Sequence, residues 1–360
     1  MSEAHFSRRY AEARRRFADA AVTAGADLAS YRVGAESEDE LAIDVAVVGA
    51  DSAPAVVVSS GVHGVEGFLG SAVQLALLER LSQARSQPSL RYVLIHGVNP
   101  FGFSNLRRCN EDNVDVNRNF LESTDDHTGA PDGYAGLDRF LNPESPPSRF
   151  EPFRLKALWN IWQRGLPALK ETVAGGQYEY PRALFFGGYG PSQSTQLVRT
   201  HCDSWLGTSQ RIVHIDFHSG LGRFGHYKLL LTDTADSAAY SWYVETFGAE
   251  CVEPLAEPDG TAYTVSGFFG GWMRSHFTSR TYYFVAAECG TYGVIRVLAA
   301  LRAENRAHHY GSQRSSAYRS AKEEPVECFC PTAASWRRQV VDGGLAIVAQ
   351  GGRALVTNVP

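Results

Sequence analysis

Apolar and polar positions along the chain follow the pattern of alternating strands and helices. Residues 55–60 form a dense run of small and β-branched side chains, which is typical of a strand buried on both faces. Apolar positions at helical spacing follow over 68–81, and 91–96 is a second buried run that ends before Asn99-Pro100. A strand, a helix and a strand in this order predict a right-handed crossover and a parallel sheet.

The rest of the chain continues this alternation. We expect further strands over 41–48, 212–217, 227–231 and 282–287, and further helices over 6–17, 153–173, 192–205, 237–246 and 294–308. Ser192 precedes its helix as the expected N-cap, because its hydroxyl can accept a bond from an unpaired backbone N–H of the first turn. These elements predict the α/β class.

Two regions depart from the alternation. Residues 122–149 are rich in Gly, Pro, Asp and Ser, which predicts a long surface insertion whose full extent we place at about 121–180. The tail over 328–359 has short apolar patches broken by glycine, a pattern that favours terminal β-hairpins. We therefore expect one main domain over 1–325 and a short β extension over 326–360 packed on it.

The composition excludes several classes of protein. The chain has 360 residues with 44% hydrophobic and 20% charged side chains, which is ordinary for a globular protein. A net charge of −5 offers no basic surface to nucleic acid or to an anionic membrane, and no apolar run reaches the ~20 residues that span a bilayer. The arginine-rich N-terminus lacks a signal-peptide core, and the scattered cysteines are typical of free thiols. We expect a cytoplasmic protein that binds neither nucleic acid nor membranes.

Polar side chains follow three of the predicted strands, namely His63, His218 and Glu288. Ligands of open α/β sheets bind beyond the carboxyl ends of the strands, so we expect these side chains to meet there. His63 and His218 together with Glu66 supply two imidazoles and one carboxylate. Such a set holds zinc and leaves a fourth position open for water, which loses its proton near neutral pH. The three residues therefore predict a catalytic zinc site.

The strand before His218 contains a rival set of ligands. His214, Asp216 and His218 alternate along the strand, so that all three face the same side. Three ligands on one strand seldom surround an ion well. We therefore favour His218 as the metal ligand, with His214 or Asp216 as a core residue or as a group that supports the ligand.

Several motifs in fixed order resemble the zinc carboxypeptidase superfamily, and more closely an uncharacterised bacterial branch of it. The match extends from about Ala55 to Leu298. It comprises His63-x-x-Glu66, Asn99-Pro100-Phe101-Gly102, Arg108-Cys109-Asn110, Val114-Asp115-Val116-Asn117-Arg118-Asn119-Phe120, His218-Ser219, Tyr263-x-x-Ser266-Gly267 and Glu288-x-x-x-Tyr292-Gly293.

The resemblance implies a fold and a metal site. The fold is a three-layer α/β/α sandwich with a mixed, largely parallel central sheet, and the main domain is its catalytic domain. One Zn²⁺ per chain is bound by His63, Glu66 and His218. Asp115 matches the aspartate that orients a zinc-bound histidine, a function that such histidines generally require.

The resemblance also implies how a substrate is held and cleaved. Arg108 matches the arginine that polarises the scissile carbonyl, and Glu288 matches the general base that activates water. Asn117 and Arg118 match the pair that holds a substrate carboxylate, for which a guanidinium is suited because it donates at two points. Tyr263 matches a mobile tyrosine that closes over the substrate.

Each assignment has an ordinary structural alternative. Arg118 is then an ion-pair partner, Glu288 a carboxylate near the start of a helix, and Tyr263 a core residue. Arg107 adjoins Arg108, which leaves the polarising arginine open between the two.

Three functions are compatible with these residues. The first is a metallocarboxypeptidase acting on a peptide, and the second is an N-acyl amino acid deacylase like aspartoacylase or succinylglutamate desuccinylase. Both use the same zinc site, and Tyr263 upstream of Glu288 favours the peptidase. The third is a non-catalytic binding protein, which the presence of Glu288 and all three ligands disfavours. The sequence does not predict the oligomeric state.

Overall fold

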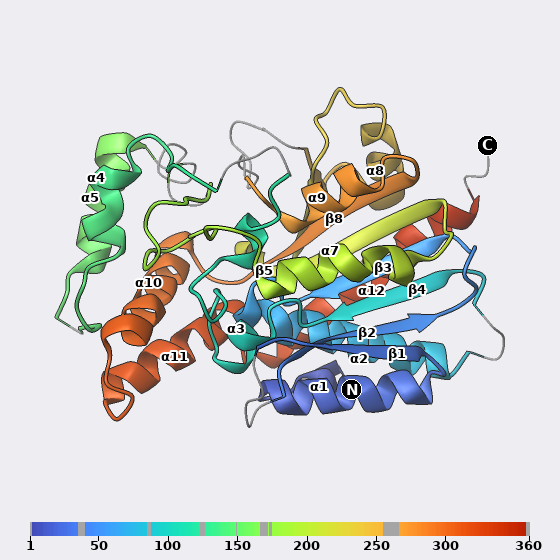
Figure 1. The fold of residues 1–360 in the computed structure, drawn as a ribbon, viewed down its shortest axis with the longest axis horizontal. Coiled ribbons are helices and arrows are strands. Elements are labelled where there is room, and N and C mark those ends of the chain that lie inside the picture. The colour runs from blue at the N-terminus through green and yellow to red at the C-terminus, as the bar shows by residue number, and fades with distance from the viewer. Residues whose placement is uncertain are drawn as a thin grey trace.

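In the part of the chain that the structure describes, eight strands form one mixed sheet between two layers of helices (Figure 1). This computed structural model describes residues 2–34, 40–84, 88–122, 127–148, 150–165, 172, 175–254 and 266–357. The strands are β1 (Asp27–Arg32), β2 (Ala42–Val48), β3 (Ala55–Ser60), β4 (Arg91–His96), β5 (Arg211–Phe224), β6 (Tyr227–Leu231), β7 (Val252–Glu253) and β8 (Thr281–Gly290). The expected three-layer α/β/α fold is confirmed.

The order of strands across the sheet is β1-β2-β4-β3-β5-β8-β6-β7. The four central strands, β4, β3, β5 and β8, are parallel, whereas β1, β2 and β6 pair antiparallel with their neighbours towards the centre. Every residue of β3 is buried, which is the reason for its unbroken run of small and β-branched side chains. The parallel centre brings the carboxyl ends of β3, β5 and β8 to the same edge.

Helices cover both faces of the sheet. One face carries α1 (Tyr10–Thr23), α2 (Gly67–Ser82), α8 (Tyr240–Phe247) and α12 (Ala334–Thr357), and the other carries α7 (Gln193–Leu206) and α9 (Phe269–His276). Short helices are η1 (Ser2–His5), η2 (Gly64–Glu66), α3 (Pro100–Ser104) and η3 (Val116–Arg118). The predicted N-cap of α7 is confirmed, since Ser192 accepts a bond from the backbone N–H of Thr195. No helix in the described ranges is both long and apolar enough to cross a membrane.

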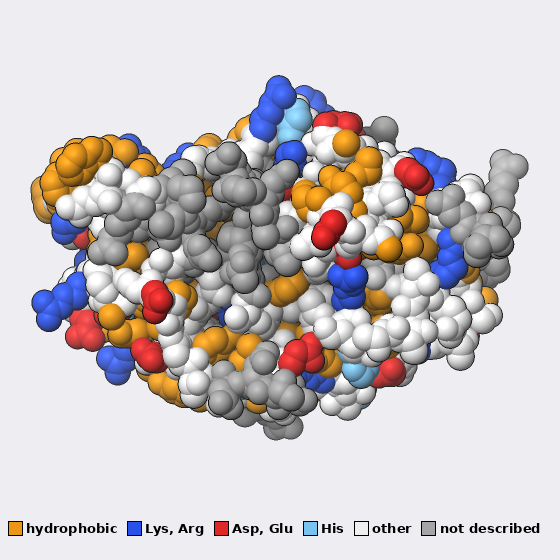
Figure 2. All heavy atoms as spheres, turned by 90° about the horizontal axis from the view of Figure 1, so that it is seen from above, with side chains coloured by type: hydrophobic (Ala, Val, Ile, Leu, Met, Phe, Trp, Pro, Cys, Tyr) orange, Lys and Arg blue, Asp and Glu red, His pale blue; other side chains and the backbone are white. Residues whose placement is uncertain are grey.

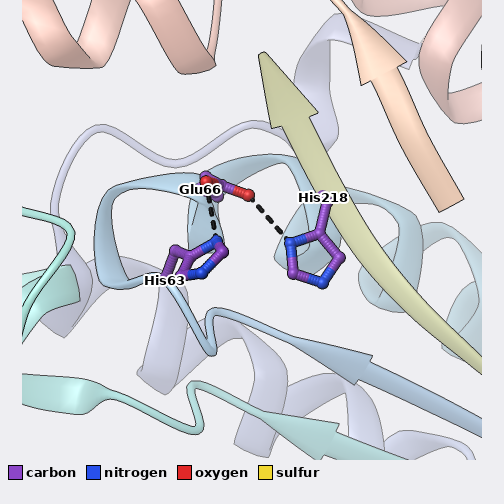
Figure 3. Close-up of side chains that lie close together, drawn as sticks. All are labelled: His63, Glu66 and His218. Atoms are coloured by element: carbon purple, nitrogen blue, oxygen red, sulfur yellow. Dashed lines mark hydrogen bonds and ion pairs between the residues drawn. The ribbon is translucent and has the colours of Figure 1, made fainter. Parts of the chain in front are cut away.

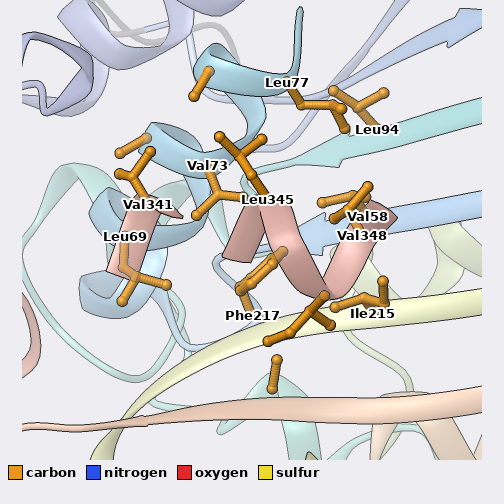
Figure 4. Packing of buried hydrophobic residues seen from close by; sticks show 14 of the residues in the cluster. Val58, Leu69, Val73, Leu77, Leu94, Ile215, Phe217, Val341, Leu345 and Val348 are labelled. Carbon is orange, nitrogen blue, oxygen red and sulfur yellow. The ribbon is translucent and has the colours of Figure 1, made fainter. Parts of the chain in front are cut away.

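The C-terminal tail is helical, and the prediction of a β extension over 326–360 is wrong. Residues 316–329 form α11 (Ser316–Phe329), and α12 packs directly on α2 and the sheet. Figure 4 shows side chains of α12, such as Leu345, between α2 and β5 in the main core.

The glycines of α12 explain the wrong prediction. A Cβ atom at Gly344 would lie 2.9 Å from a methyl group of Val73, and one at Gly351 would lie 3.1 Å from a methyl group of Val213. These glycines let the helix approach α2 and the sheet closely, so they are packing positions inside a helix and do not interrupt strands. A domain boundary near residue 325 would fall inside α11, and α12 belongs to the main core.

The insertion contains two described helices, α4 (Tyr134–Leu141) and α5 (Phe153–Arg164), which lie beside α10 (Val294–Tyr310) (Figure 1). Helix α5 begins where we expected and ends at Arg164, while 166–171 and 173 of the expected range lie outside the described residues. Glu151, just before α5, accepts bonds from Arg302 at 2.6 and 2.9 Å and from Arg306. These pairs attach the insertion to α10.

We expect Glu151→Gln to lower the free energy of unfolding by about 1–3 kcal/mol, because two largely buried guanidinium groups lose their anion. Although burial acts in the opposite direction, Arg302 and Arg306 lower the pKa of Glu151 to about 2. The stabilisation is therefore complete above the ordinary carboxyl pKa of 4.5 and is lost as the pH falls from there towards 2. Urea unfolding at several pH values tests this.

The exposed Glu144, in the same insertion, provides the matched control Glu144→Gln. The wild-type protein and the control should lose more stability than Glu151→Gln between pH 5 and pH 3. Equal losses in all three proteins would contradict an ion pair at Glu151.

Candidate metal centre

Three predicted ligands meet at the carboxyl edge of the sheet. The Nδ1 atom of His63 lies 3.0 Å from one carboxylate oxygen of Glu66, and the Nδ1 atom of His218 lies 3.2 Å from the other. Ligand atoms of the three side chains are all within 4.8 Å of one another, and all three residues are buried (Figure 3). Two nitrogens and a carboxylate in this arrangement can hold a metal ion.

The backbone around η2 brings His63 and Glu66 together. The chain turns at Gly61, whose φ is +70°, and η2 then places Glu66 three residues after His63. A Cβ atom at Gly64 would lie 2.1 Å from the carbonyl carbon of Gly102, so only glycine allows this approach. Backbone bonds from Gly64 to Arg108 and from Val65 to Arg107 join this turn to the loop that carries Arg108.

Each histidine has a carboxylate at its opposite ring nitrogen. The Nε2 atom of His218 lies 2.7 Å from Asp216, and the Nε2 atom of His63 lies 3.4 Å from Asp115. A proton held by Asp216 on Nε2 of His218 leaves the Nδ1 atom of that ring unprotonated and able to bind a metal. Asp115 lies beside His63. Asp216 is the carboxylate that contacts the second nitrogen of His218. From the sequence alone, either His214 or Asp216 could have supported this ligand.

The rival set of ligands on β5 is not assembled. His214 is bonded through Nε2 to the hydroxyl of Ser59 at 2.7 Å and through Nδ1 to the hydroxyl of Tyr282 at 2.8 Å. Burial lowers the pKa of His214 to about 4, so the ring is neutral at physiological pH. It is a satisfied core histidine.

Charges around the centre stabilise the carboxylate of Glu66 and the protonated form of His218. Burial by itself would raise the pKa of Glu66, but the electrostatic interactions and hydrogen bonds with His63 and His218 outweigh it and hold the pKa below its usual value. Burial would lower the pKa of His218, but Asp216 and Glu66 raise it well above the ordinary histidine value. The two carboxylates beside His218, Asp216 and Glu66, therefore favour a bound cation at the site of the three ligands.

Glu288 lies on β8 in register with His218 on the neighbouring strand β5. One of its carboxylate oxygens accepts a bond from the backbone N–H of Leu221 at 2.8 Å. Desolvation, with a further contribution from the negative charge of Glu66, raises the pKa of Glu288 to about 7. A carboxyl group with such a pKa can accept and return a proton near neutral pH.

Arg108, and not Arg107, lies at the centre. Its Nε donates to Asp115 at 2.7 Å, its Nη2 lies 2.6 Å from Nε2 of His63, and its guanidinium is 5.0 Å from the ring centre of Phe185. Arg107 is completely buried and donates instead to Asn113 at 2.7 Å. Of the two adjacent arginines, Arg108 is therefore the one that can reach a molecule beside the ligands.

The predicted substrate-binding pair lies next to Asp115. Arg118 is buried, donates to the carbonyl of Asn117 at 2.7 Å, and helps to lower the pKa of Asp115. The side-chain oxygen of Asn117 accepts a bond from the backbone N–H of Phe269 at 2.9 Å. Tyr263 lies outside the described residues, so its prediction is neither supported nor contradicted.

A cavity of about 160 Å³ begins at the three polar groups His63, Glu66 and Arg108, with Glu288 beside them. Most of its other walls are apolar and come from helices that the motifs do not include. Phe185, with a left-handed φ of +60°, is one of these wall residues. An aromatic residue in this conformation is strained, which is common where structure serves a site, but the sequence carries no local signal for it.

Comparison with known proteins supports the fold. A family model described as Protein of unknown function (DUF2817) matches residues 6–343, and no curated protein matches significantly. Bovine thrombin-activatable fibrinolysis inhibitor, in complex with tick carboxypeptidase inhibitor, is similar with a TM-score of 0.59 at 12% identity, over 99% of each chain. Carboxypeptidase A from Helicoverpa armigera has a TM-score of 0.51 at 11% identity, over 91% of this chain and 74% of that chain. This similarity confirms the carboxypeptidase-like fold.

Proposed function

We propose that this chain, which belongs to the DUF2817 family, is a zinc-dependent hydrolase that cleaves an amide bond next to a free carboxylate. The observation that carries the proposal is the meeting of His63, Glu66 and His218 beside Glu288. A fold by itself does not imply an activity, so the proposal depends on these side chains.

The residues present suit zinc. Two imidazole nitrogens and one carboxylate leave a position open for a further ligand, and both imidazoles have a carboxylate at the second nitrogen. Zinc bound there would polarise an amide carbonyl and lower the pKa of a water molecule.

Glu288 is placed to move the proton in such a reaction. Its pKa of about 7 lets it take a proton from the attacking water and pass it to the leaving amine. The bond from Leu221 holds one carboxylate oxygen, so the group has a defined orientation.

Arg108 is placed to stabilise negative charge on the carbonyl oxygen. Its guanidinium lines the cavity beside His63 and Glu66, and Asp115 and Phe185 hold it there. A donor aimed at a developing oxyanion contributes about 3–4 kcal/mol to catalysis. We assign the binding of the substrate carboxylate to Asn117 and Arg118, and closure over the substrate to Tyr263.

Among amide hydrolases, a metallocarboxypeptidase is the first candidate, and the similarity to an insect carboxypeptidase A supports it. An N-acyl amino acid deacylase is the alternative, because it requires the same metal, base and carboxylate-binding groups. A binding protein without activity would not need a carboxyl group with a pKa of about 7, such as that of Glu288, beside the metal ligands.

The proposal predicts metal content and substrate class together. The purified protein should contain about one zinc per chain, and it should hydrolyse peptides with a free C-terminus at least about 100-fold faster than the same peptides with a C-terminal amide, because the guanidinium of Arg118 then has no carboxylate to bind. N-acyl amino acids assayed in parallel separate the peptidase from the deacylase. Protein that refuses zinc, or that cleaves none of these amides when loaded, would overturn the proposal.

A further inference from the structure

The cavity at the metal centre has a polar end and a long apolar end. His63, Glu66, Arg108 and Glu288 lie at the polar end. Beyond them the walls consist of aliphatic and aromatic side chains, among them Phe140, Ala157, Ile161, Val297, Leu298 and Phe329.

The apolar walls come from segments far apart in the sequence. Helix α10 supplies one wall, the insertion helices α4 and α5 supply another, and the last residue of α11, Phe329, closes the side near the strands. The hydroxyl of Ser219, which follows His218, donates to the carbonyl of Phe329 at 2.7 Å and ties this residue to the centre. The ion pairs of Glu151 hold the insertion against α10. These contacts hold the walls of the cavity in place.

Space beside Glu288 is kept open by a glycine. Gly220 has a φ of +143°, and a Cβ atom there would lie 3.1 Å from the ring of Phe329 and 3.5 Å from a carboxylate oxygen of Glu288. A side chain at this position would fill the passage from Glu288 into the apolar end. Gly220 thus connects the reacting groups to that end.

The apolar end offers no charge to a ligand. Asn160 on α5 is the one polar side chain among the described residues that line this end, and its Nδ2 already donates to the carbonyl of Lys156 at 2.9 Å. A charged or strongly polar group placed here would lose its hydration without gaining a partner. An apolar group would gain free energy by leaving water.

The position of the cavity identifies the part of the substrate that enters it. Arg108 and Glu288 line the cavity, whereas Asn117 and Arg118, to which we assign the substrate carboxylate, are not among its described lining residues. The carboxylate belongs to the amine half of the amide. The cavity therefore receives the acyl half.

The volume sets the size of the acyl group. An apolar cavity of about 150 Å³ holds a molecule of benzene. The whole cavity, with its polar end included, has a volume of about 160 Å³, so its apolar end is suited to an apolar group of up to roughly six carbons.

We propose that the substrate carries an apolar group of roughly six carbons on the acyl side of the scissile amide, and that α10 and the insertion helices α4 and α5 select it. This rests on the proposed function and names the substrate class of the same site. The group is either a linear acyl chain or the aromatic or aliphatic side chain of the residue before the scissile bond.

Binding of the acid products tests the inference without requiring turnover. Calorimetric titration of the zinc-loaded wild-type protein with acetate, butanoate and hexanoate should give a Kd that falls about fourfold per methylene group, on the order of 200-fold over the four methylene groups between acetate and hexanoate. Hexanoate that binds no more tightly than acetate would overturn the inference.

Two substitutions reduce the space from different walls, Leu298→Trp on α10 and Ala157→Leu on α5. Each should reduce the preference for hexanoate over acetate at least tenfold, with zinc content and thermal unfolding measured in parallel. Leu158→Trp is the matched control, because Leu158 on α5 is 54% exposed and is not among the described lining residues of the cavity. Figure 2 shows hydrophobic side chains gathered on the surface at the α4–α5 end of the molecule. The control should keep the full preference. Retention of the preference in both folded cavity variants would contradict the inference.

Hydrolysis distinguishes the two forms of the group and separates the inference from the proposed function. N-hexanoyl-L-alanine and N-acetyl-L-phenylalanyl-L-alanine are compared with N-acetyl-L-alanine. Faster cleavage of the first or of the second supports a linear acyl chain or a side chain, respectively. Equal cleavage of all three would leave the proposed function standing and overturn the inference. Tight hexanoate binding with no cleavage of any amide would overturn the function while the apolar acid site remained.

Discussion

Replacing Glu288 with glutamine is expected to lower amide hydrolysis about 1,000-fold while the metal stays bound. Glutamine has nearly the same shape and can still accept the bond from Leu221, but it cannot take a proton from water. General-base catalysis typically contributes about 10²–10⁴-fold. None of the three metal ligands is altered, so zinc content should equal that of the wild-type protein.

Zinc content and kcat/KM measured on the same preparation check this prediction. Glu144→Gln, an exposed change in the insertion, serves as the control and should leave both quantities unchanged. Metal-loaded Glu288→Gln with undiminished turnover would remove Glu288 from the mechanism and leave it as a carboxylate near the start of α10.

Replacing His218 with alanine is expected to abolish stable zinc binding and to reduce hydrolysis at least about 1,000-fold. The change removes one of three ligands, whereas loss of a group that only supports a ligand typically costs about 10–100-fold in metal affinity. Asp216→Asn should therefore weaken zinc by about 10–100-fold, because Asp216 contacts Nε2 of His218 without reaching the Nδ1 side. Competition with a chelator of known affinity measures both effects.

His214→Gln is the matched control on the same strand. His214 is bonded to Ser59 and Tyr282, so its loss costs core stability but leaves the three ligands in place. The affinity for zinc should therefore fall least in His214→Gln, more in Asp216→Asn and most in His218→Ala. If His214→Gln lost zinc as completely as His218→Ala, the ligands would instead be the alternating residues of β5.

Much of the fold could be predicted because the local pattern and the tertiary environment agree. Residues 55–60 and 91–96 are buried strands with the predicted bounds. In α1, which overlaps the helix expected over 6–17, the residues Tyr10, Ala13 and Phe17 are buried at helical spacing. The pattern failed in the tail over 334–357. In the sequence, the glycines of this tail look like interruptions between short strands. In the structure they are the positions at which α12 approaches α2 and β5 closely.

The candidate site divides in the same way. His63, His218 and Glu288 could be found from the sequence because each comes directly after an apolar run that predicts a strand. In the structure β5 and β8 continue past His218 and Glu288, which lie just beyond the level where β3 ends. The sequence could not decide which of Arg107 and Arg108 reaches the centre, because the directions of two adjacent side chains are fixed only when the loop folds.

By itself, the sequence determined the α/β class, the order of the central strands along the chain and the residue types available for a metal centre. These follow from periodic burial and from side-chain chemistry, both of which are local properties. Only the tertiary structure decided that Asp216 supports His218 and that an apolar cavity extends from Glu288 between α10 and the insertion. The first was decided because His214 is bonded to the distant Ser59, and the second depends on contacts such as Glu151 with Arg302. Both contacts join segments more than one hundred residues apart, and no local pattern records which distant surfaces will meet.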